Sequence, residues 1–349
     1  MTKAHGLVIT LLVCVIGLYG SFILWSVLQE RINTKPYGTT ELGDGVYFKA
    51  PLMINIVQAF FASIVGFVYC MVTTKTSPFN VFTKNESSLT WKISKLFVLI
   101  AITSSLSSPL GYESLKHVDY LAYLLAKSCK LIPVMLIHMV FYGTRFPLYK
   151  YIVAISVTFG VTVFTLSHHA SKNSASIDDG DYVLGMAQLI GSMLLDGLTN
   201  STQDQLFQLQ ASNPKMTKIT GASLMCILNL LVCGLSLSFA VISKYHEEID
   251  YTLQFIREYP AVLRNILEFA LFGSIGQVFV FIILEKFDSL ILITATVTRK
   301  MISMILSVIL FGHYLNNLQW GGVGLVFAGI GYEAVVKMKG KKPTKEKKA

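Results

Sequence analysis

The sequence predicts an all-α integral membrane protein of ten transmembrane helices, arranged as two inverted repeats of five. Its 349 residues are 53% hydrophobic and only 14% charged, which excludes an ordinary water-soluble domain. Apolar runs of about 20 residues, the length that crosses a hydrocarbon core of about 30 Å, recur along the whole chain. The two halves also resemble each other. Because no long polar region remains, we expect a single membrane domain over residues 1–349.

The apolar runs place the ten spans in order along the chain. They lie at about 6–28, 51–73, 93–113, 118–141, 149–167, 182–200, 217–243, 262–284, 289–311 and 318–337. The first run is too long for a signal peptide, and no small-residue cleavage site follows it, so we expect it to remain as a membrane helix. An even number of spans puts both ends on one side. The loops of that side carry more Lys and Arg, which predicts cytosolic termini.

A shift of about 170 residues aligns the fourth and fifth spans with the ninth and tenth. Lys130 then aligns with Lys300 and Phe141 with Phe311, and LKHVDYL at 115–121 matches LEKFDSL at 284–290 with one residue of gap. A repeat with an odd number of helices enters the membrane in opposite directions in its two copies. We therefore predict repeats at about 6–167 and 182–337, related by a two-fold axis in the membrane plane and followed by a basic tail at 338–349. A shared site near the midplane suits alternating access.

Four basic side chains within the predicted spans carry the main functional signal: Lys127 and Lys130 in the fourth, and Arg299 and Lys300 in the ninth. A cation at the centre of a spanning helix costs roughly 2.5–3.5 kcal/mol, so four cost on the order of 10 kcal/mol. Lys127 and Lys130 would share one helix face and repel each other unless an anion lay between them. Arg299 and Lys300 are about 100° apart, so one should face a cavity and the other its rim or a carboxylate. We predict a carrier of a phosphate-bearing solute. The alternative is a set of structural ion pairs.

Other polar residues in the spans extend the candidate site. Glu30 and Asp196 are acids that could neutralise the empty basic site and couple cargo release to reorientation. Glu113, Glu268 and Glu333 are further acids of the spans, for which interfacial carboxylates at helix ends are the alternative. Four further side chains could contact a base or a sugar, or else hydrogen-bond between helices: Gln29, Tyr123, Asn229 and Gln277.

Several classes of function find no support in the sequence. The five cysteines all fall in apolar spans, without disulfide or metal spacing, so we expect them to serve as packing residues. No nucleophile–base constellation is present, and we predict neither an enzyme nor a bound cofactor or metal. The net charge of +9 comes largely from the tail and the membrane cations, which argues against nucleic acid as a partner.

The C-terminal tail carries a candidate localisation signal. Lys345 and Lys347 are the fifth and third residues from the end. On a cytosolic tail this spacing fits the dilysine pattern by which coat machinery returns membrane proteins to the endoplasmic reticulum. A basic tail attracted to anionic lipid is the alternative.

Three strings give a family resemblance: LLAKSCKLIPVML, LLDGLTNSTQDQL and TVTRKMISMILSVILF. With them the chain resembles the nucleotide-sugar transporter family of the drug/metabolite transporter superfamily, above all its endoplasmic reticulum branch of UDP-galactose transporter homologues. The resemblance implies ten helices in two repeats, with phosphates held by Lys127, Lys130, Arg299 and Lys300. It also implies an antiporter that exchanges UDP-galactose or UDP-glucose for UMP and supports glycosylation and protein folding in the lumen. ATP/ADP exchange across the same membrane is an alternative within this branch, and a channel or scaffold is an alternative of another class.

Overall fold

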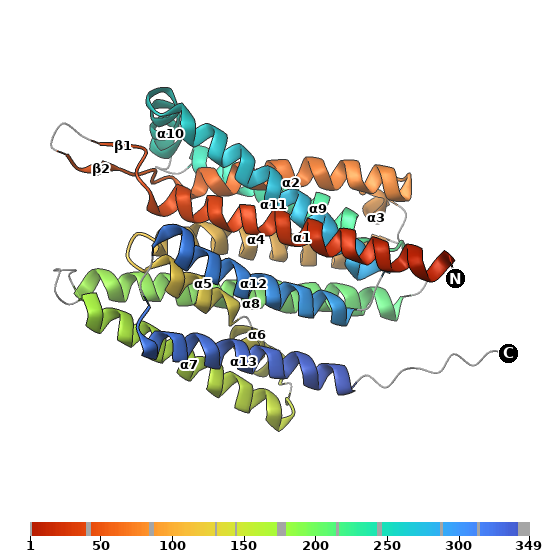
Figure 1. The fold of residues 1–349 in the computed structure, drawn as a ribbon. Helices are drawn as coiled ribbons and strands as arrows, with labels where there is room; N and C mark the ends of the chain where they lie inside the picture. Colours follow the sequence, from red (N-terminus) through yellow and green to blue (C-terminus); the bar gives the residue numbers. More distant parts are fainter. Residues whose placement is uncertain are drawn as a thin grey trace.

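The fold was established from a computed structural model, which describes residues 2–39, 43–83, 87–129, 131–143, 145–172, 179–213, 216–242, 246–286, 289–312 and 315–340. Helices dominate it and run roughly side by side (Figure 1). The helices are α1 Thr2–Thr34, α2 Pro51–Thr74, α3 Asn80–Thr83, α4 Ser87–Ser114, α5 Tyr120–Ser128, α6 Leu131–Tyr142, α7 Leu148–Lys172, α8 Asp179–Ser212, α9 Gly221–Ile242, α10 His246–Glu258, α11 Pro260–Lys286, α12 Ser289–Phe311 and α13 Asn317–Gly340.

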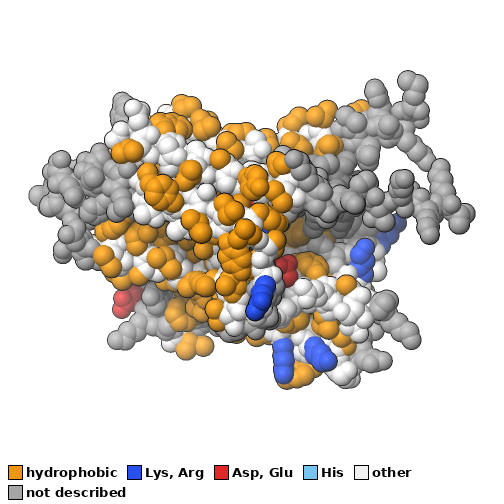
Figure 2. Space-filling view, turned by 90° about the horizontal axis from the view of Figure 1, so that it is seen from below, with side chains coloured by type: hydrophobic (Ala, Val, Ile, Leu, Met, Phe, Trp, Pro, Cys, Tyr) orange, Lys and Arg blue, Asp and Glu red, His pale blue; other side chains and the backbone are white. Residues whose placement is uncertain are grey.

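Each predicted span coincides with a helix or, for the fourth, with a pair of helices. Among the described residues, six helices are long and apolar enough to cross a membrane: Ile9–Thr34, Pro51–Thr74, Ser87–Ser114, Tyr182–Ser212, Gly221–Ile242 and Pro260–Ile283. On the face in Figure 2 the described side chains are mostly apolar, and few of them are charged. The protein is therefore an all-helical, multi-pass membrane protein. The full count of ten crossings stays a prediction.

The fourth predicted span is interrupted, which corrects the expectation of one continuous helix over 118–141. It consists of α5 and α6, and α5 ends at Ser128 with Cys129 as its C-cap. Pro133 explains the break, because proline lacks an N–H and its ring clashes with the carbonyl four residues earlier. The helical spacing argument that joined Lys127 to Lys130 on one face therefore does not apply. Lys130 itself lies outside the described residues.

One end of the bundle carries an additional helix. The predicted spans leave residues 244–261 as a loop, but the structure has α10 there, with Glu247 and Glu248 in its first turn, where acids favour the helix dipole. A carboxylate oxygen of Glu248 accepts a hydrogen bond from the N–H of Leu52 at 3.0 Å and so ties α10 to the start of α2. A two-residue antiparallel pair, β1 Gly38–Thr39 with β2 Gly45–Val46, lies at the same end, opposite both termini (Figure 1).

Four long helix pairs make up most of the bundle: α1 packs on α11, α2 on α9, α4 on α8, and α7 on α13. In the last pair two glycines allow close approach. A Cβ atom on Gly160 would lie 2.8 Å from the carbonyl oxygen of Gly322, and one on Gly322 would lie 2.6 Å from that of Gly160. Small residues serve such contacts because dispersion forces drive helix association in lipid. All five cysteines are free and four are buried, in agreement with a packing role.

Candidate functional site: a basic cavity inside the bundle

A cavity of about 650 Å³ lies between helices from both halves of the chain. Its walls come from α1, α2, α4, α5, α8, α9, α11 and α12. Such a volume is within the range of small-molecule sites, which are typically about 300–1,000 Å³. Three cations face this space, Lys127 from α5 and Arg299 and Lys300 from α12. The cavity is therefore suited to an anionic solute.

The structure brings most of the predicted site residues together, although they lie up to 271 positions apart in the sequence. The predicted residues that line the cavity are Gln29, Tyr123, Lys127, Asp196, Asn229, Gln277, Arg299 and Lys300. Glu30 is placed elsewhere: it is 1% exposed and is not among the residues that line the cavity. Lys130, Lys345 and Lys347 lie outside the described residues.

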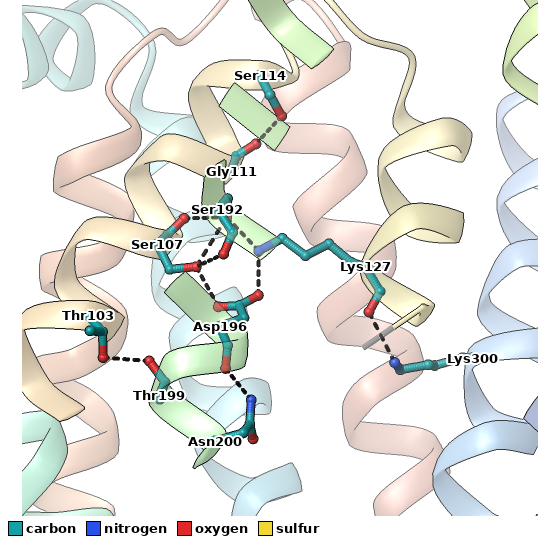
Figure 3. A network of polar contacts seen from close by, with 10 residues as sticks. All are labelled: Thr103, Ser107, Gly111, Ser114, Lys127, Ser192, Asp196, Thr199, Asn200 and Lys300. Atoms are coloured by element: carbon teal, nitrogen blue, oxygen red, sulfur yellow. Dashed lines mark hydrogen bonds and ion pairs between the residues drawn. The ribbon is translucent and has the colours of Figure 1, made fainter. Parts of the chain in front are cut away.

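Lys127 is held by a polar network between α5, α4 and α8 (Figure 3). Its ammonium lies 2.6 Å from Asp196 Oδ2 and donates to the hydroxyl of Ser192, also at 2.6 Å. Ser107 donates to the other carboxylate oxygen of Asp196. The side chains of Lys127 and Asp196 are 20% and 36% exposed, so the pair borders the cavity rather than the helix core. An anion entering the cavity can thus compete with Asp196 for Lys127.

Lys300 makes a contact that depends on the interrupted helix. Its ammonium donates to the backbone carbonyl oxygen of Lys127 at 3.4 Å (Figure 3). Lys127 lies in the last turn of α5, where carbonyl groups have no partner within the helix. Unwound backbone at membrane depth is tolerated where it borders a cavity, and it commonly binds cations there. The end of α5 therefore holds the ammonium of Lys300 on the backbone carbonyl of Lys127, next to the Lys127 side chain.

Arg299 also lines the cavity, so both α12 cations border it. Its guanidinium carbon lies 4.4 Å from the ring centroid of Phe22, a cation–π geometry. Its Nε is buried and has no hydrogen-bond partner among the described residues. A planar guanidinium held in this way suits bidentate recognition of a phosphate.

The neutral candidates are only partly engaged. The hydroxyl of Tyr120 lies 3.4 Å from the side-chain oxygen of Gln29, but its nearer acceptor is the carbonyl of Ser26 at 3.0 Å. Asn229 donates through its amide to the carbonyl of Met225 on the same helix at 2.7 Å, so its side-chain oxygen is the group available to the cavity. Both amides therefore keep hydrogen-bonding capacity beyond the contacts named here.

Sequence reasoning missed part of the polar lining. Ser107 and Ser192 complete the lysine network, and the unpredicted polar residues of the wall are Ser26, Asn55, Gln58, Ser104, Ser108, Tyr112, Ser128, Gln203 and Ser303. A signal was present in α4, where Ser104, Ser108 and Tyr112 recur at four-residue spacing and so share one face. Hydroxyls are common in membrane helices, however, and the spacing alone does not distinguish a cavity face from a helix contact.

The UAA transporter family model matches residues 10–337. The chain belongs to the UAA transporter family. Its relatives include proteins named UDP-galactose transporter homolog 1. That of Debaryomyces hansenii is 67% identical, with 99% of both chains covered; that of Candida albicans is 57% identical, with 95% of this chain and 90% of the relative covered; and that of Saccharomyces cerevisiae is 39% identical, with 96% and 97% covered.

The family confirms the resemblance carried by the three sequence strings, and it identifies the chain as a transporter rather than an enzyme. A crystal structure of an 11% identical chain aligns with a TM-score of 0.56, over 94% of this chain and 99% of the other. At that identity the likeness concerns the fold alone. The cavity described above lies between helices from both halves of this UAA family member.

Proposed function

We propose that the protein is an antiporter of the endoplasmic reticulum membrane that carries UDP-galactose or UDP-glucose into the lumen in exchange for UMP. The observation that carries the proposal is the convergence of Lys127, Arg299 and Lys300 on one cavity in a transporter family member. A diphosphate can accept hydrogen bonds from all three cations at once. The relatives' printed name, UDP-galactose transporter homolog 1, supports a UDP-sugar as the cargo. This activity would supply lumenal glycosylation and protein folding.

We further propose two inverted repeats of five membrane helices. The helix pairs support this arrangement, because exchanging the first five spans with the last five turns the α1–α11 pair into the α8–α4 pair. The same exchange maps the α2–α9 and α7–α13 pairs onto themselves, and the α1–α12 contact onto the contact of α8 with the α5–α6 span. Rocking one repeat against the other would expose the cavity to each side in turn.

The arrangement of apolar clusters supports a conformation closed at the α10 end. There a single cluster, which includes Ile32, Ile54, Tyr112, Phe255 and Phe269, joins α1, α2, α4, α10 and α11. At the end of the termini the clusters are separate. One joins α1 to α11, and another joins α3, α4, α8 and α9. With cytosolic termini, as the loop charges predict, this conformation would receive cargo from the cytosol.

Asp196 would couple the release of cargo to the reorientation of the carrier. It neutralises Lys127 in the cavity at 2.6 Å and would be displaced when phosphate takes that lysine. When cargo leaves, re-forming the ion pair would compensate the lysine again, so the cavity would not have to reorient with an unpaired charge. The cation and the acid together would thus favour exchange of one anion for another over return of an empty carrier.

We propose an endoplasmic reticulum location for the protein because its tail carries the two lysines of a retrieval signal. Replacing Lys345 and Lys347 with Ser should send it onward in the secretory route, because coat proteins could no longer retrieve it. Fluorescence microscopy of the tagged double variant checks this, with Lys341→Ser and Lys342→Ser as a control of equal charge. An unchanged location of the first variant contradicts the retrieval signal.

Counter-flow in liposomes containing the purified protein tests the transport proposal. The liposomes are preloaded in turn with UMP, ADP or no nucleotide, and uptake of labelled UDP-galactose, UDP-glucose or ATP is followed. Uptake of a UDP-sugar driven by internal UMP is the expected result. Uptake of ATP driven only by internal ADP would replace the UDP-sugar with an adenine nucleotide as cargo. No uptake by folded protein with any of these pairs would overturn the proposal.

A further inference from the structure

A second cavity, separate from the basic one, opens on the side of the bundle. It has a volume of about 1100 Å³ and lies between α4 and α9, next to the first turns of α2 and α10. Its long walls are apolar and include Ile102, Leu106, Leu110, Leu235 and Phe239. Leu106 and Phe239 are each 50% exposed. We call this cavity the lateral groove.

The groove changes in character along its length. At the α10 end it is lined by charged side chains of both signs: Lys49, Glu113, Lys116, Glu247 and Glu248. On α4 the wall extends from Glu113 back to Ile102, which at 1.5 Å per residue is about 16 Å. That is about half of a hydrocarbon core of about 30 Å, or one leaflet. A polar end and one leaflet of apolar wall match the shape of a single membrane lipid.

The charged side chains at the polar end differ in how far neighbouring residues hold them. Lys116 is paired with Glu113 at 2.6 Å and keeps two further N–H donors. The backbone N–H of Lys49 donates to the hydroxyl of Tyr251, which itself donates to the carbonyl of Tyr47. The Lys49 and Glu247 side chains are exposed, and neither forms an ion pair with another described residue. Two ammonium groups and nearby carboxylates can thus be presented to one headgroup.

We propose that the lateral groove binds one phosphatidylethanolamine molecule of the adjoining leaflet. Lys49 and Lys116 would bind its phosphate, and Glu247 would accept hydrogen bonds from its primary ammonium. A choline headgroup has no N–H to donate, and an anionic headgroup has no cation to offer the carboxylates, so both fit this end less well. One acyl chain would lie along Leu106 and Leu110. This site is separate from nucleotide transport and does not depend on the proposed cargo.

The groove and the basic cavity share a thin wall. Ser236 lines the groove, Asn55 lines the cavity, and the Asn55 amide donates to the Ser236 hydroxyl at 3.2 Å. This bond joins α2 to α9, one of the pairs that would move if the two halves rock. A bound lipid would therefore contact the helix pair that forms one side of the cargo site.

Native mass spectrometry of the full-length protein in detergent tests the proposal. The protein is titrated with equimolar phosphatidylethanolamine, phosphatidylcholine and phosphatidylglycerol. We expect one retained phosphatidylethanolamine per chain and at least about tenfold weaker retention after Lys49→Ala with Lys116→Ala, since the double variant removes both cations that would bind the phosphate. Lys92→Ala, at the opposite end of α4, should leave retention unchanged.

Two further variants keep the test decisive should the double variant fold poorly. Glu247→Lys should shift the preference to phosphatidylglycerol, because it replaces the ammonium acceptor with a cation. Leu106→Trp should fill the apolar wall and expel the lipid while circular dichroism stays unchanged. Equal, weak retention of all three lipids in every variant would overturn the proposal. So would a wild-type preference for phosphatidylglycerol, or a dimer that retains no lipid.

Discussion

The ammonium group of Lys300 lies 3.4 Å from the backbone carbonyl oxygen of Lys127, at the point where α5 ends inside the bundle. Lys127 in turn directs its own ammonium at Asp196. Lys127 thus accepts a hydrogen bond from Lys300 through its backbone carbonyl, while its own side chain supplies a second cation to the cavity. A helix end, and not only a set of side chains, therefore organises the basic cavity.

Removal of single cations should weaken transport without unfolding the protein. Lys300→Ala and Arg299→Ala each remove a charge-assisted hydrogen bond to phosphate, worth about 1.5–3 kcal/mol. We expect the KM for the nucleotide to rise at least about tenfold in liposome uptake, since about 1.4 kcal/mol is tenfold in affinity. Lys92→Ala, on α4 and outside the cavity, is the control. An unchanged KM in both cavity variants would contradict the proposal that Lys300 and Arg299 bind the phosphate.

Asp196→Asn should tighten nucleotide binding and slow exchange. The substitution removes the carboxylate that competes with phosphate for Lys127 and leaves the cavity more positive. We expect a lower KM together with a lower maximal rate, and Asp196→Glu should restore part of that rate. If the pair were instead purely structural, the variant would lose stability and leave the KM of the remaining folded protein unchanged. Uptake kinetics and thermal unfolding of the same preparation separate the two outcomes.

Pro133→Ala should slow transport because it changes the backbone between α5 and α6. Alanine restores an N–H and removes the ring clash, so the helix can continue from α5 into α6 and engage carbonyls near Lys127. Thermal stability should be maintained or raised, while the rate of counter-flow falls. Pro133→Gly also supplies an N–H but has poor helix propensity, and it should retain more activity. Equal rates in all three proteins would show that the break has no part in transport.

Gly322→Ala should destabilise the protein, whereas Gly324→Ala, two residues later in α13, should not. A Cβ on Gly322 would meet the carbonyl oxygen of Gly160 at 2.6 Å, but one on Gly324 would meet nothing within 4 Å. Overpacking of this kind costs about 1–3 kcal/mol. A fluorescence thermal-shift assay in detergent should show a lower Tm for the first variant only. Equal Tm values would mean that the contact between α7 and α13 accommodates the added methyl group without cost.

The sequence by itself identified the membrane character, the positions of the apolar helices and the three cations that line the cavity. The physical reason is that water exclusion acts on every residue of a span, so long apolar runs and costly charges stand out without knowledge of the partners. It did not find the break at Cys129, although Pro133 was visible, because apolar periodicity continues across the interruption. α10 was missed because its polar residues outweigh its short apolar stripe.

Only the tertiary structure decided which polar groups face one another. Glu30 and Asp196 are both acids within spans, yet Asp196 reaches Lys127, whereas Glu30 is buried away from the cavity lining. Ser107 and Ser192, 85 positions apart, became part of the site only because α4 packs on α8. Hydropathy records the depth of a residue in the membrane but not its direction around the helix axis. Direction is fixed by the packing of helices from distant parts of the chain, and it is direction that assembles the site.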